Sequence, residues 1–466
     1  MHLWIYWWDA IWLLRPACSR LRTFMWFTVC VAGLTIRSDL LGVTSIVRAL
    51  GLHERFYDNL LDCFHSTGIQ LDRMTALWGQ LVLKLFPGIV RVKGRLVLVG
   101  DGIKVPKQGK KMPAVKRLHQ ESESNTKAEY IMGHSFQAVS LLAQAAEGVF
   151  AVPLAIRIHE GIVLSNRDKR TLFDKMIRLL AVVGIDQPFY FVADAYYANR
   201  KIVKGMLAQG NHLVTRAKSN AVAYEKPRQQ GKRKRGRPKI YGKKVALKLL
   251  FHRQQTMEQA DSPVYGEKGV ALQYRVCDLL WRPAGQTVRF VAVIHPTRGR
   301  CLLMSTDLSL SAIEIIRLYG LRFKIEHTFK QAVRVIGTFS YHFWMMTMKP
   351  LRRRNGNQFL HKESKEYRKG IIRKINAYHV FVHAGIVSQG LLQYLAVCYP
   401  KLVWDSFGSW LRTIRPGVAP SELVVATALR HSFPDFLLGA ANNNNLVKFI
   451  MERQDSDRMG VLRLVS

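Results

Sequence analysis

Two short apolar runs, each ending at an aspartate, constrain the possible folds of this chain more than any other feature. Residues 95–101 read Arg-Leu-Val-Leu-Val-Gly-Asp, and residues 189–194 read Phe-Tyr-Phe-Val-Ala-Asp. Short runs rich in β-branched and aromatic residues, bounded by turn-forming residues, are typical of buried strands. We therefore predict a sheet that presents Asp101 and Asp194 at its edge. A single aspartate of this kind would be explained equally well by a turn or a helix cap.

A third acidic residue lies in a later helical pattern. The sequence Ser311-Ala-Ile-Glu314 has the form of a capping box, which predicts a helix beginning there and continuing until about Gly337. At about 100° per residue, one narrow stripe of this helix carries five side chains. They are Tyr319, Arg322, Glu326, Lys330 and Val333. An ordinary Arg–Glu pair on a solvated helix is the alternative explanation of this stripe taken alone.

The three carboxylates together predict a metal site. Asp101, Asp194 and Glu326 offer only oxygen ligands, which suit Mg²⁺ or Mn²⁺. The sequence has no His or Cys spacing typical of zinc, and its six cysteines are scattered. Scattered cysteines are typical of reduced core residues in a cytoplasmic protein rather than of a disulfide framework.

These residues and their surroundings resemble the DDE transposases of bacterial insertion sequences, and among them the group called the IS-four family. The resemblance extends over roughly residues 24–455 and rests on the three acids and the pattern Tyr319-x2-Arg322-x3-Glu326. It includes four further segments: Gly100–Lys107, Met112–Ser122, Tyr130–His134 and Ser305–Leu308. The family pattern continues to a lysine where this chain has Val333, so Lys330 or Arg334 is left to make that phosphate contact.

The resemblance implies a ribonuclease-H-like α/β core, and the order of strands and helices predicted for residues 94–215 is compatible with it. The strands are expected at 95–100, 130–143, 149–160 and 189–193, and the helices near 167–183 and 197–209. The resemblance also implies that Asp101, Asp194 and Glu326 bind two Mg²⁺ or Mn²⁺ ions. Arg322 and Tyr319 would then contact the DNA.

Six segments are expected along the chain. Residues 1–23 are an apolar extension, 24–92 a helical domain that binds DNA ends, and 93–215 the first part of the core. Residues 216–300 form a mainly β insertion, 301–400 the second part of the core, and 401–466 a helical tail. Within 24–92, residues 42–64 have the spacing of a helix–turn–helix, and a plain helical bundle explains them equally well.

The charge balance points to a polyanionic partner. The chain has 70 Lys and Arg against 32 Asp and Glu, a formal net charge of +38. A protein this basic usually binds nucleic acid, and its basic surface alone is the simpler alternative. Lys104 and Lys107 follow Asp101 in a basic loop and are expected to hold phosphates next to the scissile bond. Residues 226–253 carry twelve Lys and Arg and no acid, which predicts a second phosphate-binding loop.

The apolar start of the chain does not predict a membrane protein. Residues 3–14 are interrupted by Asp9, and the apolar run 24–36 is shorter than the ~20 residues that a transmembrane helix needs. We expect 24–36 to be a buried helix and leave open whether residues 1–20 are an extension, a frayed arm or an interface.

Two functions remain at this point. The first is a Mg²⁺-dependent transposase that binds double-stranded DNA, both the ends of its element and the target, as a homodimer in the nucleoid-associated cytoplasm. The second is a DNA-binding protein without catalysis, such as a repressor. A membrane-surface protein is a third and weaker alternative.

Overall fold

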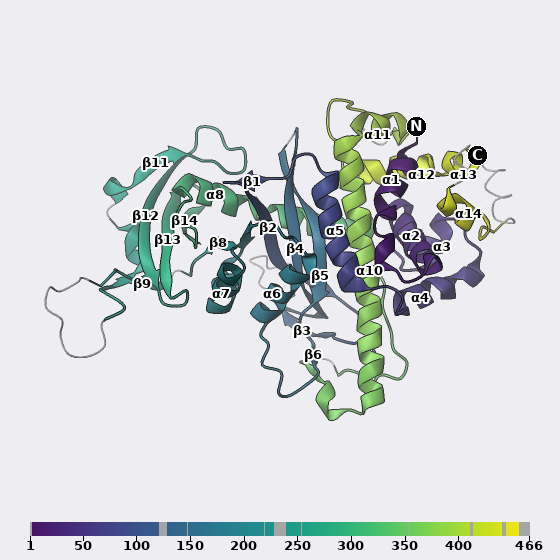
Figure 1. Cartoon of the computed structure of the whole chain (residues 1–466), viewed down its shortest axis with the longest axis horizontal. Helices are drawn as coiled ribbons and strands as arrows, with labels where there is room; N and C mark the ends of the chain where they lie inside the picture. The colour runs from purple at the N-terminus through teal and green to yellow at the C-terminus, as the bar shows by residue number, and fades with distance from the viewer. Residues whose placement is uncertain are drawn as a thin grey trace.

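The computed structural model describes residues 2–120, 128–146, 148–218, 220–227, 239–252, 254–352, 354–410, 413–439 and 444–455. A large mixed sheet crosses the middle of the molecule. Its β-rich end, which includes β9–β14, forms one lobe, and the N-terminal and C-terminal helices pack together at the opposite end (Figure 1).

Five strands form the part of the sheet that carries the acids. They are β2 (Arg95–Pro106), β4 (Tyr130–Ala145), β5 (Gly148–Ile158), β7 (Phe189–Ala193) and β8 (His212–Arg216). Their order is β5-β4-β2-β7-β8; β2, β7 and β8 are parallel, and β4 is antiparallel to β2 and β5. Helix α6 (Leu172–Val183) leads into β7, and α7 (Arg200–Ala208) connects β7 to β8. The four expected strands and both helices are therefore present, while β8 was not expected.

Strand β2 continues past the point where its apolar run ends. Asp101 pairs with Ala138 of β4, and the ladder extends to Pro106 opposite Gly133. Asp101 therefore lies within a strand rather than at its end. The tertiary pairing with β4 satisfies the backbone of residues 101–105, which their sequence alone does not mark as strand.

The strands of residues 222–305 extend the same sheet. They are β9 (Val222–Tyr224), β10 (Lys244–Ala246), β11 (Glu258–Asp261), β12 (Ala271–Trp281), β13 (Gln286–His295) and β14 (Gly299–Ser305). Because β14 pairs with β8, these strands and those around the acids belong to one 13-stranded sheet. Within this mainly β part, residues Leu247–Phe251 form a 3₁₀ helix. The basic run 231–238, at the centre of the second expected phosphate-binding loop, lies outside the described residues.

The N-terminal helices are α1 (Leu3–Trp12), α2 (Leu21–Ile36), α3 (Thr44–Ala49), α4 (Tyr57–His65) and α5 (Leu71–Leu85). The first of them belongs to the core. Trp4 is fully buried, its indole N–H donates to the Leu429 carbonyl at 3.0 Å, and its ring stacks on Phe436 at 5.5 Å. Helix α2 is buried along nearly its whole length, as expected for residues 24–36.

The C-terminal helices are α10 (Lys365–Cys398), α11 (Pro400–Phe407), α12 (Glu422–His431), α13 (Phe433–Leu438) and α14 (Asn445–Met451). Helix α10 runs along the helical end of the molecule beside α5 (Figure 1). Among the described helices it alone has the length and composition of a membrane span, and 89% of its most apolar window is buried inside the protein. This is the burial expected of a core helix.

Four short strands complete the described elements: β1 (Arg91–Val92), β3 (Lys116–His119), β6 (Ile162–Val163) and β15 (Gln358–Phe359). Strand β1 pairs with β2, β3 pairs with β4, and β6 pairs with β15 in a separate two-stranded sheet. Strand β3 follows Pro106 at the end of β2, so it returns the chain to the edge of β4.

The expected single helix of residues 311–336 is divided. The capping box of Ser311 and Glu314 begins α8 (Ala312–Leu321), and α9 (Lys324–Gln331) leads into a π-helical turn at Ala332–Ile336. Between α8 and α9 the backbone forms tighter bonds, from Ile325 N–H to Arg322 O and from Glu326 N–H to Phe323 O. Gly320 lies just before this point, where a Cβ atom would stand 2.3 Å from the Val264 side chain.

Candidate active site

The register of two parallel strands brings Asp101 and Asp194 together. The paired residues of β2 and β7 differ by 93 in number, from Leu96 with Phe189 to Val99 with Val192. Asp101 and Asp194 differ by the same 93, so they are the pair two residues beyond the end of this ladder. Adjacent strands are about 4.8 Å apart, so these two aspartates follow the buried ladder as neighbours.

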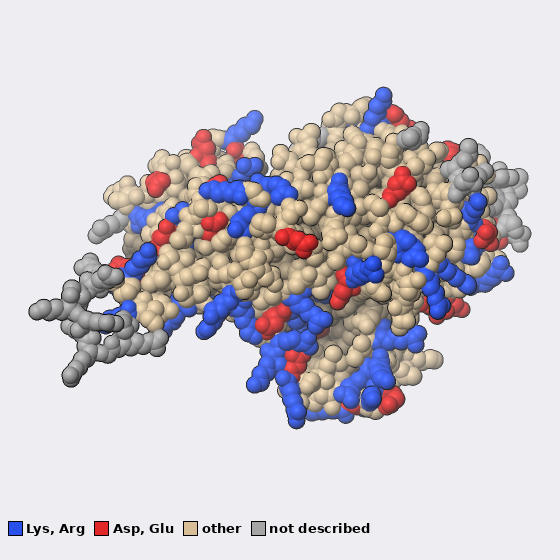
Figure 2. Space-filling model, viewed as in Figure 1, with Lys and Arg blue, Asp and Glu red and all other residues tan. Residues whose placement is uncertain are grey.

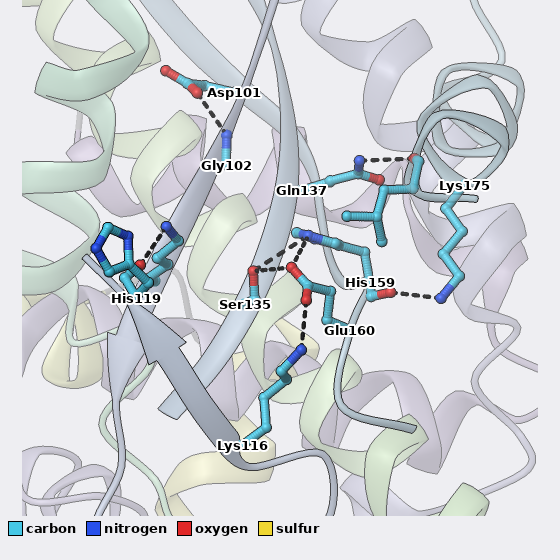
Figure 3. Close-up of polar contacts among 11 residues, drawn as sticks. Asp101, Gly102, Lys116, His119, Ser135, Gln137, His159, Glu160 and Lys175 are labelled. Atoms are coloured by element: carbon cyan, nitrogen blue, oxygen red, sulfur yellow. Dashed lines mark hydrogen bonds and ion pairs between the residues drawn. The ribbon is translucent and has the colours of Figure 1, made fainter. Parts of the chain in front are cut away.

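Asp101 is largely buried and held by two donors. Its carboxylate accepts the Gly102 N–H at 2.7 Å (Figure 3) and the Arg322 guanidinium at 2.5 Å. Burial raises the pKa of Asp101 to about 6, against the opposing effect of Arg322 and the Gly102 N–H. The charges of Asp194 and Glu326 also raise this pKa. Two acids that are distant in the sequence, Asp194 and Glu326, therefore both lie within electrostatic reach of Asp101.

Asp194 caps the turn that follows β7. Its carboxylate accepts the Tyr196 N–H at 3.1 Å, and its main-chain carbonyl accepts the Thr215 hydroxyl at 2.6 Å. The cap fixes the backbone at the strand end and leaves the carboxylate half-buried beside Asp101.

Arg322 forms ion pairs with both Asp101 and Glu326. One guanidinium nitrogen donates to Asp101, and the other donates to Glu326 at 3.1 Å, four residues further along. The Arg322 side chain is 19% exposed, whereas that of Glu326 is 43% exposed. Burial alone would lower the pKa of Arg322, but the surrounding acids hold it above its ordinary value. Arg322 is therefore the cation that balances this carboxylate cluster.

The donor chemistry of the cluster fits a hard divalent cation, because all three side chains offer carboxylate oxygens. Across the described ranges, however, no group of three or more His, Cys, Asp or Glu side chains is close enough to hold a metal ion. The reason at this site is visible in the contacts, since Arg322 lies between Asp101 and Glu326. A cation bound there would take the place of the guanidinium.

The other side chains expected to bind DNA differ in accessibility. Lys330 is exposed on α9, and Lys104 is exposed on β2, where its ammonium donates to the His119 carbonyl at 2.7 Å. Tyr319 is half-buried on α8, with the Arg322 guanidinium 6.0 Å from its ring centre. Although the predicted helix is divided into α8 and α9, Arg322 and Glu326 still contact each other as the stripe in the sequence predicted.

Lys107 is not placed as the sequence indicated. It is only 4% exposed, and its ammonium donates to the main-chain carbonyls of Phe339 and Tyr341. Burial lowers its pKa to about 7. In this structure Lys107 ties the loop after β2 to the segment after the π-helical turn, so its side chain is turned away from solvent.

Sequence reasoning missed Tyr197, which lies beside the acids. This tyrosine is buried, and burial together with Asp101 and Asp194 raises the pKa of its hydroxyl. Its side chain hydrogen-bonds to Gln137 of β4. The tyrosine pair that directly follows Asp194-Ala195 was the available signal, but only the fold shows which of the two turns inward.

Comparison with known proteins gives one match and one negative result. A protein-family model described as "DDE superfamily endonuclease" matches residues 19–282, more than half of the chain. This range includes Asp101 and Asp194 and ends before Glu326. No curated protein matches the chain.

Proposed function

Because the chain belongs to the DDE superfamily of endonucleases, we propose that it is the transposase of a bacterial insertion sequence, similar to the IS-four family. It binds the double-stranded ends of its element, cleaves DNA strands there and transfers them to a target. The observation that carries this proposal is that Arg322 bridges Asp101 and Glu326, while the charge of Asp194 acts on the same Asp101.

The strand arrangement supports a ribonuclease-H-like core. In the order β5-β4-β2-β7-β8, β4 alone runs opposite to the other four strands, and the adjacent strands β2 and β7 carry Asp101 and lead to Asp194. Helix α9, which carries Glu326, packs against β5 and β2. Three separate elements thus supply one acid each.

Asp101, Asp194 and Glu326 are the residues that would hold Mg²⁺ or Mn²⁺, with two ions proposed. Bound divalent cations would supply an activated water and relieve the charge on the leaving 3′ oxygen. Asp101 would be the ligand shared by both ions, because the charges of the other two acids both act on it. With its pKa raised to about 6, Asp101 is available as a carboxylate ligand above that pH and loses this ability below it.

The protein's own cations would position the DNA. Arg322, once free of the two carboxylates, presents a planar fork of donors that suits a phosphate. Tyr319, Lys104 and Lys330 lie on the surrounding α8, β2 and α9 and would contact the backbone on either side. Joining two ends of an element in one complex requires at least two copies of the site, so we propose a homodimer acting on DNA in the cytoplasm.

The test uses purified full-length protein, Mg²⁺ and DNA containing the sequences that flank the gene in its genome. We expect nicks at the ends of the element with wild-type protein and none with Asp101→Ala. The matched control is Asp186→Ala, which removes an exposed aspartate of the α6–β7 loop. Nicking by Asp101→Ala at the wild-type rate would refute the proposal, and end-specific binding without nicking in Mg²⁺ or Mn²⁺ would favour the repressor-like alternative.

A further inference from the structure

A cavity of 1140 Å³ lies between the helical part of the molecule and the sheet. Three separate segments supply most of its lining: the link between α4 and α5, the stretch from the end of β5 into α6, and the first half of α10. Figure 2 shows Lys and Arg side chains gathered in the lower part of the molecule, over the region of α6 and β6 and over the lower part of α10. None of the proposed catalytic acids lines this cavity.

The lining of the cavity is strongly cationic. Seven Lys and Arg residues contribute to it against three acids; the cations are Arg73, Arg157, Arg170, Lys175, Arg178, Lys369 and Arg373. Two of the acids are already neutralised locally, Glu160 by Lys116 at 2.8 Å and Asp168 by Arg170 at 2.7 Å. The cavity therefore keeps an excess of positive charge that an anion would balance.

Helix α10 presents its part of this charge on one face. Lys369, Arg373 and Asn376 follow each other at steps of four and three residues, so they lie along the same side of the helix. All three are exposed and line the cavity. Within the described part of the chain, Lys369 and Arg373 have no ion-pair partner, and neither do Arg73 and Arg178 on the other walls.

A buried histidine on the same lining has an unused nitrogen. His159 is 8% exposed; its Nε2 contacts the Glu160 carboxylate at 3.2 Å and the Ser135 hydroxyl at 3.3 Å (Figure 3). Its Nδ1 is buried and has no hydrogen-bond partner among the described residues. Buried polar atoms are nearly always bonded, so this atom marks a place for a ligand group or a bound water.

The cavity wall is next to the carboxylate cluster in the sheet. Gln137, which lines the cavity, is the cross-strand partner of Gly102, and Gly102 directly follows Asp101. The Gln137 side chain donates to the Leu172 carbonyl at 2.9 Å and also bonds to Tyr197, the tyrosine beside the two aspartates. A polyanion held in the cavity would therefore contact β4, the strand that pairs with the Asp101-bearing strand β2.

We propose that this cavity binds the phosphate backbone of the double-stranded DNA that flanks the cleavage site, with Lys369 and Arg373 as two of its phosphate contacts. The inference rests on the proposed function for the identity of the polyanion. The volume exceeds the ~300–1,000 Å³ typical of small-molecule pockets. The unpaired cations also come from three separate walls, an arrangement that suits an extended chain of phosphates better than a single anionic group.

The experiment measures the affinity of full-length protein for a short DNA duplex by fluorescence anisotropy, with EDTA present so that no strand is cut. Each phosphate contact contributes about 0.9 to the slope of log K against log salt concentration. We therefore expect Lys369→Ala/Arg373→Ala to reduce the steepness of this slope by about 2. The matched control is Lys401→Ala/Lys448→Ala, which removes two exposed lysines from α11 and α14 and should leave the slope unchanged.

Equal slopes in the two double variants would overturn the inference. Binding of inorganic tripolyphosphate tests whether the cavity takes a free polyphosphate instead of DNA. If the wild-type protein binds tripolyphosphate stoichiometrically, Lys369→Ala/Arg373→Ala does not, and the salt dependence of DNA binding is the same in both, the inference is also overturned. The nicking assay above keeps the two proposals distinguishable. Asp101-dependent nicking with equal slopes refutes only the cavity, whereas nicking independent of Asp101 with a reduced slope refutes only the catalytic assignment.

Discussion

Replacing Arg322 tests the idea that a guanidinium occupies the place of a divalent cation. The change is Arg322→Gln, which keeps much of the side-chain length and removes the charge that contacts Asp101 at 2.5 Å and Glu326 at 3.1 Å. In the wild-type protein a metal ion must displace this guanidinium before it reaches the carboxylates. In the variant it need not, so we expect the variant to bind a divalent cation more tightly in the absence of DNA.

The magnitude follows from Coulomb's law. Two unit charges about 4 Å apart attract by roughly 4 kcal/mol at an effective dielectric constant near 20. Because Arg322 is 19% exposed and regains water when it is displaced, we discount this to about 1.5–3 kcal/mol. Each 1.4 kcal/mol is about tenfold in affinity, so the expected gain is ~10- to 100-fold.

Isothermal titration with Mn²⁺ measures this affinity directly. The matched control is Arg317→Gln, because Arg317 is an exposed arginine on α8 to which no role in the site is assigned. DNA cleavage should fall in Arg322→Gln, since its phosphate contact is lost, even as metal affinity rises. Unchanged or weaker Mn²⁺ binding in Arg322→Gln would refute the reasoning.

Three further predictions concern the acids and the first helix. The pKa of Asp101 is raised to about 6 in the folded protein. Protonation of Asp101 therefore adds to the free energy of unfolding at low pH, and this contribution is lost as the pH rises through 6. Metal affinity has the opposite dependence, so Mn²⁺ binding should weaken about tenfold per pH unit below 6, and a flat profile would contradict the assignment. Asp194→Asn should reduce nicking by ~10²- to 10³-fold while DNA affinity in EDTA is retained, whereas Asp186→Asn should change neither. Trp4→Ala should destabilise the protein by ~3–5 kcal/mol in denaturant unfolding, because it empties a buried site and removes the indole hydrogen bond to the Leu429 carbonyl; a change below about 1 kcal/mol would show that α1 is dispensable.

Part of this structure could be predicted from the residues because it depends on local patterns. The apolar runs before Asp101 and Asp194 form buried strands, and the capping box at Ser311 begins a helix. Strand and helix periodicity bury one face or stripe of each element, so short-range sequence is enough to identify them.

Where the prediction was wrong, a distant partner decided the outcome. Strand β2 continues through Asp101 because β4 supplies hydrogen bonds up to Gly133. The helix predicted to carry Arg322 and Glu326 divides just after Gly320, which packs closely against Val264. Lys107 turns inward because the carbonyls of Phe339 and Tyr341 accept its ammonium.

The sequence by itself determined which side chains can do chemistry: three acids, an arginine four residues before one of them, and a large excess of positive charge. Only the tertiary structure decided that a common offset between β2 and β7 aligns Asp101 with Asp194 and that Arg322 spans Asp101 and Glu326. It also gathered cations from three distant segments around one cavity. The physical reason is that residue type and local periodicity are written in neighbouring positions, whereas register, packing and the meeting of charges depend on pairings between segments far apart in the chain.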